Sequence, residues 1–172
     1  MPKPKIHISP NQRSKVSQFE KDRVGVVETN VDDVTGEIIG VTLEKLIQQG
    51  AYDATATPFL GKKGRPGITV RVVCEPNSVE KYAKLLVEET GTFGVKTYES
   101  TRLIVPRKVI FVHVNIGSYS GQVNTKVSLF GKNPKFKPEM SEAKKISESE
   151  GIPLRRVIEL ITIAAENQLN HR

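Results

Sequence analysis

Residues 61–67 place three cations among three glycines in seven consecutive positions. Glycine lets a backbone approach an anion closely, and Lys and Arg side chains donate charge-assisted hydrogen bonds to phosphate oxygens. This combination predicts a binding site for a triphosphate. The spacing is not that of a P-loop, so a solvated basic loop fits the same residues about equally well, although the proline in the segment favours a stiffer loop. The candidate ligands are Lys62, Lys63, Gly64, Arg65 and Gly67.

A second set of candidate ligands lies in the run Glu-Thr-Asn-Val-Asp-Asp of residues 28–33, where an expected strand meets an expected helix. Hard cations such as Mg²⁺ take oxygen ligands, and one or two carboxylates together with nucleotide phosphates make an ordinary magnesium site. Asp32 and Asp33 are therefore candidate metal ligands. In a purely structural alternative, which base rates favour, Asp33 caps the helix and Asp32 interacts with the helix dipole.

Residues 89–94, Glu-Thr-Gly-Thr-Phe-Gly, form an expected turn after a helix. The hydroxyls of Thr90 and Thr92 could reach a ribose or a phosphate, and Arg102 follows on the next expected strand. Taken alone, the segment is better explained as a helix C-cap at Gly91 followed by an ordinary turn. A binding role for these residues therefore depends on their lying near the basic loop.

The hydrophobic pattern of residues 23–105 predicts the scaffold that positions these groups. The expected elements are a strand at 23–30, a helix that starts at Thr35–Glu37 and stops at Gly50, strands at 51–58 and 68–75 around the loop 59–67, a helix capped by Asn77 or Ser78 and closing near Gly91, and a strand at 94–105. This order is the split βαβ of a ferredoxin-like α+β unit.

The second half of the chain predicts a β-hairpin followed by two helices. The hairpin strands are expected at 109–116 and 123–130 around a turn at 117–121, and the helices at 141–150 and 153–169. We expect this C-terminal part, residues 106–172, to pack with residues 23–105 as one α+β domain.

The chain has 172 residues, with 26 Lys and Arg against 19 Asp and Glu and a net charge of +7. Six of the cations but only two of the carboxylates lie in the first 23 residues, so residues 1–22 are expected to form a basic flexible arm or linker. No apolar run approaches the roughly 20 residues of a membrane span, and the polar start lacks the apolar segment of a signal peptide. We therefore expect a soluble cytoplasmic protein.

The remaining residues that could do chemistry give little support to other enzyme classes. A lone cysteine, Cys74, excludes an internal disulfide and a thiolate metal site, and its apolar neighbours predict a buried thiol. His7, His113 and His171 are scattered, and only His113 lies in an expected strand, where its valine neighbours would point to the opposite face. No spacing suggests a Ser/His/Asp or Cys/His arrangement, so acyl transfer has no visible support.

Four segments, in this order, resemble the C-terminal domain of the LarC family, the nickel insertion proteins of nickel-pincer cofactor biosynthesis. The segments are residues 28–37 (ETNVDDVTGE), 50–67 (GAYDATATPFLGKKGRPG), 89–96 (ETGTFGVK) with 100–102 (STR), and 137–157 (KPEMSEAKKISESEGIPLRRV). Four ordered blocks are far more specific than any one motif. The family's full-length protein also has a longer part before this domain.

This resemblance implies a lyase-class enzyme, a CTP-dependent cyclometallase that inserts nickel, its substrate metal, into pyridinium-3,5-bisthiocarboxylic acid mononucleotide. It implies that this domain binds CTP with Mg or Mn, acts with the N-terminal LarC part in the same or a separate chain, and forms a homo-oligomer for which a hexamer is one expected size. For these ligands, the residue types suggest the triphosphate for Lys62, Lys63 and Arg65, and further nucleotide contacts for Thr90, Thr92 and Arg102. They suggest that Asp32 and Asp33 bind the divalent cation or orient the lysines, and Glu139 is a weaker candidate.

Two alternatives from other functional classes remain open at this point. A basic ferredoxin-like sheet also suits a nucleic-acid-binding module, but aromatic residues total only 6% and the paired aromatics that stack bases are missing, which makes nucleic acid the less expected partner. The other alternative is a non-catalytic domain that senses a small anion through the loop 61–67 and acts by oligomerising.

Overall fold

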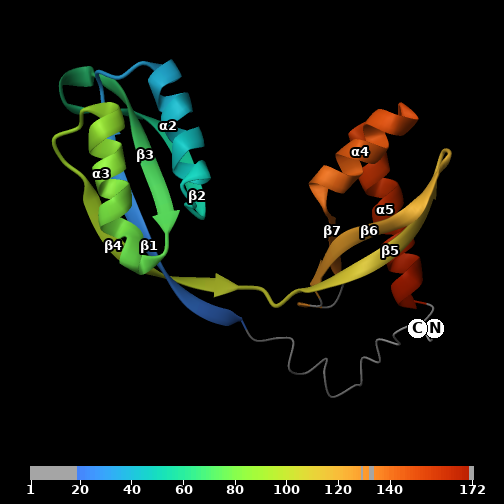
Figure 1. The fold of residues 1–172 in the computed structure, drawn as a ribbon. Helices are drawn as coiled ribbons and strands as arrows, with labels where there is room; N and C mark the ends of the chain where they lie inside the picture. The colour runs from blue at the N-terminus through green and yellow to red at the C-terminus, as the bar shows by residue number, and fades with distance from the viewer. Residues whose placement is uncertain (1–18, 129, 132–133, 171–172) are drawn as a thin grey trace. The chain divides into compact units, whose positions relative to one another are not determined.

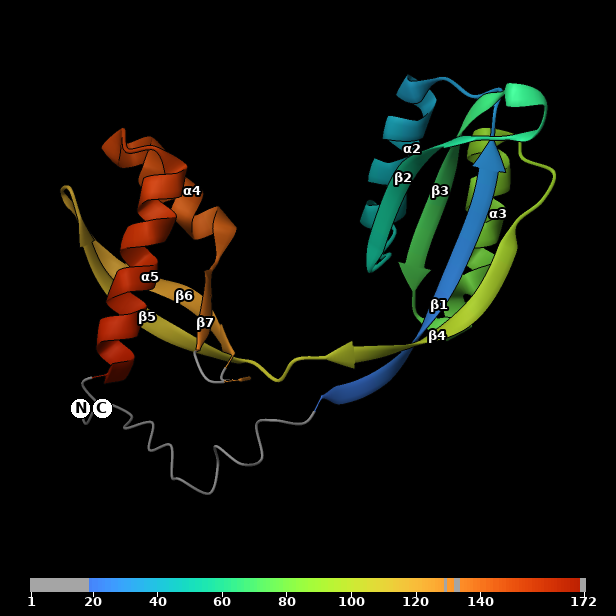
Figure 2. The same ribbon diagram turned by 180° about the vertical axis from the view of Figure 1, so that it is seen from behind.

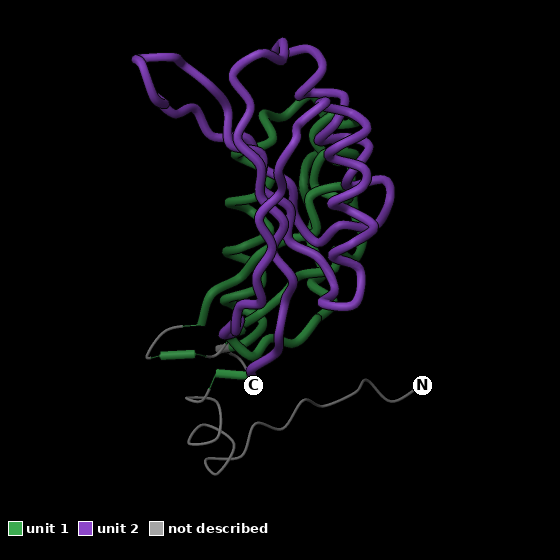
Figure 3. Tube along the Cα trace, turned by 90° about the vertical axis from the view of Figure 1, so that its left-hand side faces the viewer, with its two compact units in different colours: residues 1–20, 104–172 green, residues 21–103 purple. Residues whose placement is uncertain are grey.

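The computed structural model describes residues 19–128, 130–131 and 134–170, and these residues form two compact units. Figure 3 colours the units separately. We call residues 21–103 the split-βαβ unit and the described part of residues 104–172, together with Phe19 and Glu20, the C-terminal unit. The predicted arm at 1–22 lies outside the described residues up to position 18, whereas Glu20 already begins the first strand.

The split-βαβ unit contains a four-stranded sheet in the order β2-β3-β1-β4, and β3 runs antiparallel to both of its neighbours. Its elements are β1 (Glu20–Val31), α2 (Gly36–Gln48), β2 (Asp53–Leu60), β3 (Pro66–Cys74), α3 (Val79–Thr90) and β4 (Lys96–Ile104). This is the strand order of the ferredoxin-like fold, so the predicted α+β fold class is confirmed.

Both helices of this unit cover one face of the sheet (Figure 1). The side chain of Thr35 caps α2 by accepting a hydrogen bond from the N–H of Ile38, and Gly91 closes α3 in the left-handed conformation with φ 68°. Leu46 of α2 and Leu86 of α3 are fully buried against Val27 and other sheet residues. Burial of one apolar stripe per helix fixes the helices on the sheet and leaves the opposite sheet face polar.

The strands around the predicted loop 59–67 are longer than the sequence suggested. Leu60 pairs with Pro66 at the end of the β2–β3 hairpin, so only residues 61–65 connect the two strands. Pro66 lacks an N–H group and is tolerated as the first residue of β3. Gly67 is needed for packing, because a Cβ atom there would lie 2.5 Å from the ring of Phe59 and 2.7 Å from the carbonyl oxygen of Val31.

The C-terminal unit contains a second sheet, in the order β5-β6-β7, and two helices. Its elements are β5 (Lys108–Ile116), β6 (Tyr119–Ser128), β7 (Lys135–Pro138), α4 (Met140–Glu150) and α5 (Leu154–Asn170). The predicted hairpin and helices are confirmed. The turn is shorter than predicted, because Ile116 already pairs with Tyr119, and the short strand β7 was not predicted.

The alternation in β5 decides which face of this sheet is buried. Val112 and Val114 are buried against α4 and α5, whereas His113 between them is exposed, as expected. At the outer edge of β5, the Gln168 side chain donates a hydrogen bond to the Phe111 carbonyl and accepts one from the His113 N–H. None of the helices in the described ranges is long and apolar enough to cross a membrane.

Candidate functional site

Three chain connections meet at one end of the split-βαβ sheet, and we call this end the loop edge. They are residues 32–35 after β1, 61–65 between β2 and β3, and 91–95 between α3 and β4. Val31 pairs with Ile68, so β1 ends beside the beginning of β3. Figures 1 and 2 show from opposite sides that the β2–β3 connection and the α3–β4 connection lie at this same end. The candidate ligands from three separate segments are therefore near neighbours.

The connection 61–65 holds the predicted cations on a compact turn. Lys62–Gly64 form one turn of 3₁₀ helix, the Gly61 N–H donates a 2.7 Å hydrogen bond to the Arg65 carbonyl, and Lys63 and Gly64 both have positive φ, at 59° and 71°. All three cationic side chains are exposed. A turn closed by its own backbone hydrogen bond presents adjacent cations to solvent, which suits a polyphosphate better than a floppy loop would.

The structure brings Asp32 directly to this basic turn. An Arg65 guanidinium nitrogen lies 3.5 Å from a carboxylate oxygen of Asp32, and both side chains are well exposed. Asp33 follows on the surface beside it. The structural alternative for Asp33 is wrong, because Thr35 and not Asp33 is the N-cap of α2. Neither aspartate side chain caps α2, so both are available to bind a ligand at the loop edge.

The carboxylate Glu28 is paired by side chains on two neighbouring strands. One of its oxygens accepts hydrogen bonds of 2.8 and 3.0 Å from Arg71 on β3, and the other lies 3.5 Å from the ammonium group of Lys96 on β4. The hydrogen bond from Arg71, with the charges of both cations, lowers the pKa of Glu28 below its ordinary value. Glu28 therefore belongs to a closed ion-pair group on the open face of the sheet.

The two threonines of residues 89–94 use their hydroxyls within the fold. Thr90 is buried and donates to the Leu86 carbonyl one turn back in α3. The Thr92 hydroxyl lies 2.7 Å from the Thr29 hydroxyl of β1 and 3.1 Å from the Gly94 carbonyl oxygen, to which it donates. The predicted C-cap at Gly91 is present as well. The turn reaches the loop edge, where the Thr92 hydroxyl holds it against β1, while the Thr90 hydroxyl is used within α3.

Arg102 lies at the opposite end of the sheet from the loop edge. Its guanidinium makes two hydrogen bonds to the Asp22 carboxylate, at 2.5 and 3.0 Å, and lies over the ring of Tyr52. The hydrogen bond from Arg102 lowers the pKa of Asp22. Asp22 precedes Val31, the last residue of β1, by nine residues, which is roughly 30 Å of extended strand. The structure therefore does not bring Arg102 to the basic turn.

Glu139 belongs to the C-terminal unit, whereas Asp32 and Asp33 belong to the split-βαβ unit. It immediately precedes α4, its N–H donates to the Asn124 carbonyl, and its carboxylate lies 3.5 Å from the ammonium group of Lys126. Across the described ranges, no three or more His, Cys, Asp and Glu side chains gather as a metal site would require. Asp32 and Asp33 alone can supply one or two carboxylates to a cation whose other ligands are phosphate oxygens and water.

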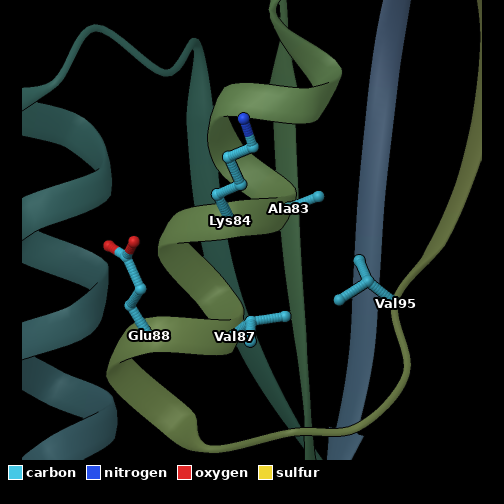
Figure 4. Close-up of a pocket in the computed structure, with 5 residues that line it drawn as sticks. All are labelled: Ala83, Lys84, Val87, Glu88 and Val95. Carbon is cyan, nitrogen blue, oxygen red and sulfur yellow. The ribbon is translucent and has the colours of Figure 1, made fainter.

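A shallow hollow lies on the outer side of α3 and does not involve the predicted ligands. It is lined by Ala83, Lys84, Val87, Glu88 and Val95. Figure 4 shows the side chains of Ala83 and Val87 directed toward Val95, whereas Lys84 and Glu88 point away. The hollow is thus apolar and lacks convergent polar groups to orient a charged ligand.

Comparison with known proteins identifies the family. The family model described as nickel insertion protein matches residues 6–158. This chain belongs to the nickel insertion protein family. The resemblance of the sequence to the LarC family is thereby confirmed.

Two curated relatives show how much of a longer protein the chain matches. A protein of Methanococcoides burtonii named for nickel insertion is 38% identical over 143 residues, which are 81% of this chain and 36% of the relative. The pyridinium-3,5-bisthiocarboxylic acid mononucleotide nickel insertion protein of Acetivibrio thermocellus is 33% identical, over 83% of this chain and 34% of the relative. The chain therefore spans about a third of the length of these relatives.

Two solved structures share the fold. One is LarC2 in its apo form, the C-terminal domain of a cyclometallase involved in the synthesis of the NPN cofactor of lactate racemase, with a TM-score of 0.76, 32% identity, and coverage of 86% of this chain and 99% of that chain. The other is a protein of Methanopyrus kandleri with a TM-score of 0.61, 29% identity, and coverage of 85% and 90% of the two chains. The fold thus corresponds to a domain that has been solved by itself.

Sequence reasoning missed one feature of the loop edge, the fully exposed ring of Phe93 between the fastened Thr92 and Gly94. An apolar residue in a turn gives no periodic signal that would predict its exposure.

Proposed function

We propose that this chain is the nucleotide-binding domain of an enzyme that inserts nickel into pyridinium-3,5-bisthiocarboxylic acid mononucleotide at the expense of CTP. The relative from Acetivibrio thermocellus is named for this substrate, and LarC2 is described as a domain of a cyclometallase. In this proposal the enzyme is a lyase, and the chain works with an N-terminal LarC part supplied in the same or a separate polypeptide.

The observation that carries the proposal is the meeting of the basic turn with Asp32. Lys62, Lys63 and Arg65 are exposed on a turn closed by its own backbone hydrogen bond, and Asp32 lies within 3.5 Å of Arg65. A nucleoside triphosphate needs several cationic donors for its oxygens and a carboxylate that can share its divalent cation. The loop edge offers both kinds of group from two separate segments.

The residues at this edge fit a divalent cation bound together with a nucleotide. Asp32 and Asp33 would hold Mg²⁺ or Mn²⁺, while the triphosphate and water would complete the coordination, which is the usual arrangement for magnesium with nucleotides. The bound cation would offset the charge of the phosphates. Lys62 and Lys63 would then orient the triphosphate by hydrogen bonds from their ammonium groups.

Nickel enters the proposal as the substrate metal. Cys74, which could offer a soft ligand, is fully buried, its thiol donates to the Gly25 carbonyl, and burial raises its pKa. The described part of the chain also has no group of three or more His, Cys, Asp and Glu side chains that could hold a metal ion. Because nickel favours sulfur and imidazole ligands, we propose that the sulfurs and ring carbon of the substrate hold it and that this domain handles the nucleotide.

The proposal also covers the oligomeric state of the protein and its cellular compartment. We expect a cytoplasmic homo-oligomer, with a hexamer as one expected size, and mass measurement by light scattering would determine the number of copies.

Calorimetric titration with CTP, and separately with ATP, each with Mg²⁺ or Mn²⁺, tests the proposal. Saturable binding with tighter affinity for CTP is the expected result. If neither nucleotide binds, this domain is not a self-sufficient nucleotide site and the proposal fails. Tight, steeply salt-dependent binding of generic RNA without CTP binding would favour the nucleic-acid alternative. CTP binding with no turnover in the complete enzyme would favour the anion-sensing alternative.

A further inference from the structure

The ring of Phe93 is the most exposed large apolar group among the described residues, with 108% of its reference area open to solvent. A large aromatic side chain buries roughly 150–250 Å² of surface when it packs in a core. A fully exposed ring contributes none of the stabilisation that this burial would give. The same turn contains residues that do pack, such as the half-buried Val95, which contacts the main core of the unit. The exposure of Phe93 is therefore not a general property of this turn.

The backbone around Phe93 is held in place on both sides. Before it, Gly91 closes α3 with its N–H bonded to the Val87 carbonyl, and the Thr92 hydroxyl lies 2.7 Å from the buried Thr29 hydroxyl. After it, the Gly94 carbonyl accepts hydrogen bonds from both threonine hydroxyls, at 2.8 and 3.1 Å. The ring is thus presented to solvent from a fixed turn, so little backbone entropy would be lost when a ligand contacts it.

Phe93 lies at the same end of the sheet as the basic turn. The hydroxyl of its neighbour Thr92 lies 2.7 Å from that of Thr29, two residues before the end of β1. Asp32, the first residue after β1, has a carboxylate oxygen 3.5 Å from Arg65 of the basic turn. Figures 1 and 2 show the two connections at the same end from both sides. The α3–β4 turn that carries Phe93 and the basic turn therefore both contact the end of β1, at one edge of the sheet.

We propose that Phe93 is the stacking platform for the base of the nucleotide whose triphosphate is bound by Lys62, Lys63 and Arg65. This inference rests on the proposed function, because it places the second half of the same ligand. An aromatic ring stacks on the π face of any base, which adds affinity without selecting one base. Phe93 therefore determines how much more tightly a nucleoside triphosphate binds than inorganic tripolyphosphate, while other groups select cytosine.

The test compares two ligands, CTP and inorganic tripolyphosphate, by calorimetry with Mg²⁺ on the whole chain. For Phe93→Ala we expect a roughly tenfold loss of CTP affinity, the size that one lost stacking contact produces, and an unchanged affinity for tripolyphosphate. Phe93→Leu keeps an apolar side chain but no ring, and it should lose most of the same affinity. Val41→Ala, which shortens an exposed side chain of α2, is the matched control and should leave both affinities unchanged.

Three results for Phe93→Ala would overturn the stacking role of Phe93. Wild-type CTP affinity in Phe93→Ala overturns the inference and leaves the proposed function standing. An equal loss of affinity for both ligands also overturns it, because a stacking ring touches only CTP. If Phe93→Ala instead lowers the mass of the assembly without a change in CTP affinity, the ring is a contact between proteins and the inference is wrong. If the unmodified chain binds neither ligand, the proposed function itself fails, which a titration of the wild type reveals first.

Discussion

The turn at residues 61–65 and the turn at residues 91–94 lie at the same edge of one sheet, and both are rich in glycine. In the first turn, Lys62 and Lys63 are exposed, and no ion pair joins either of them to another described residue. In the second turn, the Thr92 hydroxyl holds the turn against β1, and just before it the Thr90 hydroxyl bonds within the last turn of α3. Residue types that look equally suited to binding can therefore have different roles. The first turn leaves its lysine side chains free to bind a ligand, whereas the hydroxyls at the second turn are already hydrogen-bonded within the fold.

The largest effect should come from removing the cations of the first turn. Lys62→Ala together with Lys63→Ala should weaken CTP binding at least about a hundredfold, because two charge-assisted hydrogen bonds are lost. The free energy of unfolding should change by less than about 0.5 kcal/mol, since both side chains are exposed. Calorimetry and urea unfolding measure the two quantities.

Lys144→Ala with Lys145→Ala is the matched control, because it removes the same charge from adjacent exposed lysines of α4. CTP affinity should stay within about threefold in this control, as expected for a long-range charge effect alone. Equal losses in the two double variants would mean that the basic turn has no specific role.

The two glycines that flank Arg65 should differ in stability. Gly67→Ala forces a Cβ atom to within 2.7 Å of the Val31 carbonyl and into the ring of Phe59, and it should cost about 2–3 kcal/mol of unfolding free energy. Gly64→Ala meets no atom within 4 Å and should cost only about 1 kcal/mol for its positive φ. Urea denaturation of both variants checks the ranking, and equal costs would show that Phe59 does not pack over Gly67.

Within the second turn, Thr92 should affect stability and not binding. Thr92→Val removes the hydrogen bonds to Thr29 and Gly94, and it should cost about 1 kcal/mol of unfolding free energy while CTP affinity stays within about twofold. Thr57→Val, on the exposed strand β2, is the control and should leave both quantities unchanged. A tenfold loss of CTP affinity at unchanged stability would instead make Thr92 a direct ligand.

A smaller effect is expected at Asp32. Asp32→Asn should lower CTP affinity severalfold in Mg²⁺ and much less without a divalent cation, because an amide is a weaker metal ligand than a carboxylate. Stability should hardly change, since the pair with Arg65 is exposed. Titrations with and without Mg²⁺ measure the difference, with Asp53→Asn as the control at the other end of the sheet. A loss that is independent of Mg²⁺ would assign Asp32 to positioning Arg65.

The smallest effect concerns the paired carboxylate Glu28. Its pKa in the folded state lies below the ordinary value of 4.5, so its ion pairs contribute stability above pH 4.5, and this contribution is lost as the pH falls through the folded-state pKa. Glu28→Gln should therefore flatten the acid side of the stability profile below pH 4.5 without affecting CTP binding. Urea unfolding at several pH values tests this, and an unchanged slope would show that Arg71 and Lys96 do not hold the carboxylate ionised.

The sequence predicted the order of elements in both units because each helix and most strands bury one clear apolar stripe. Leu46 is one of the apolar residues at near-helical spacing that mark α2, and the alternation around Val112 marks β5. The short strand β7 was missed because it has only four residues, two of them lysines, and too short a pattern to stand out. Strand ends near residues 60 and 66 depended on the packing of Phe59 over Gly67, which a linear pattern does not contain.

The residue types of the candidate site could be predicted from the sequence, but the contacts that each side chain makes in the fold could not. The basic turn was recognisable because cations and glycines are adjacent in the chain. The engagement of Thr92 with Thr29, and the position of Arg102 beside Asp22, depend on strand pairing between residues far apart in the sequence. Thr35 rather than Asp33 became the cap of α2 because the helix starts later than the aspartates.

Nucleotide binding at the loop edge is tested most directly by titrating the isotopically labelled chain with CTP and Mg²⁺. The backbone amide signals in NMR spectra report which residues respond. A nucleotide site at the loop edge predicts saturable shifts at residues 61–65 and 32–33, with smaller shifts at 92–94, and unchanged signals around Asp22 and Arg102 at the far end of the sheet. Shifts confined to that far end, or the absence of any saturable shift, would contradict a nucleotide site at the loop edge.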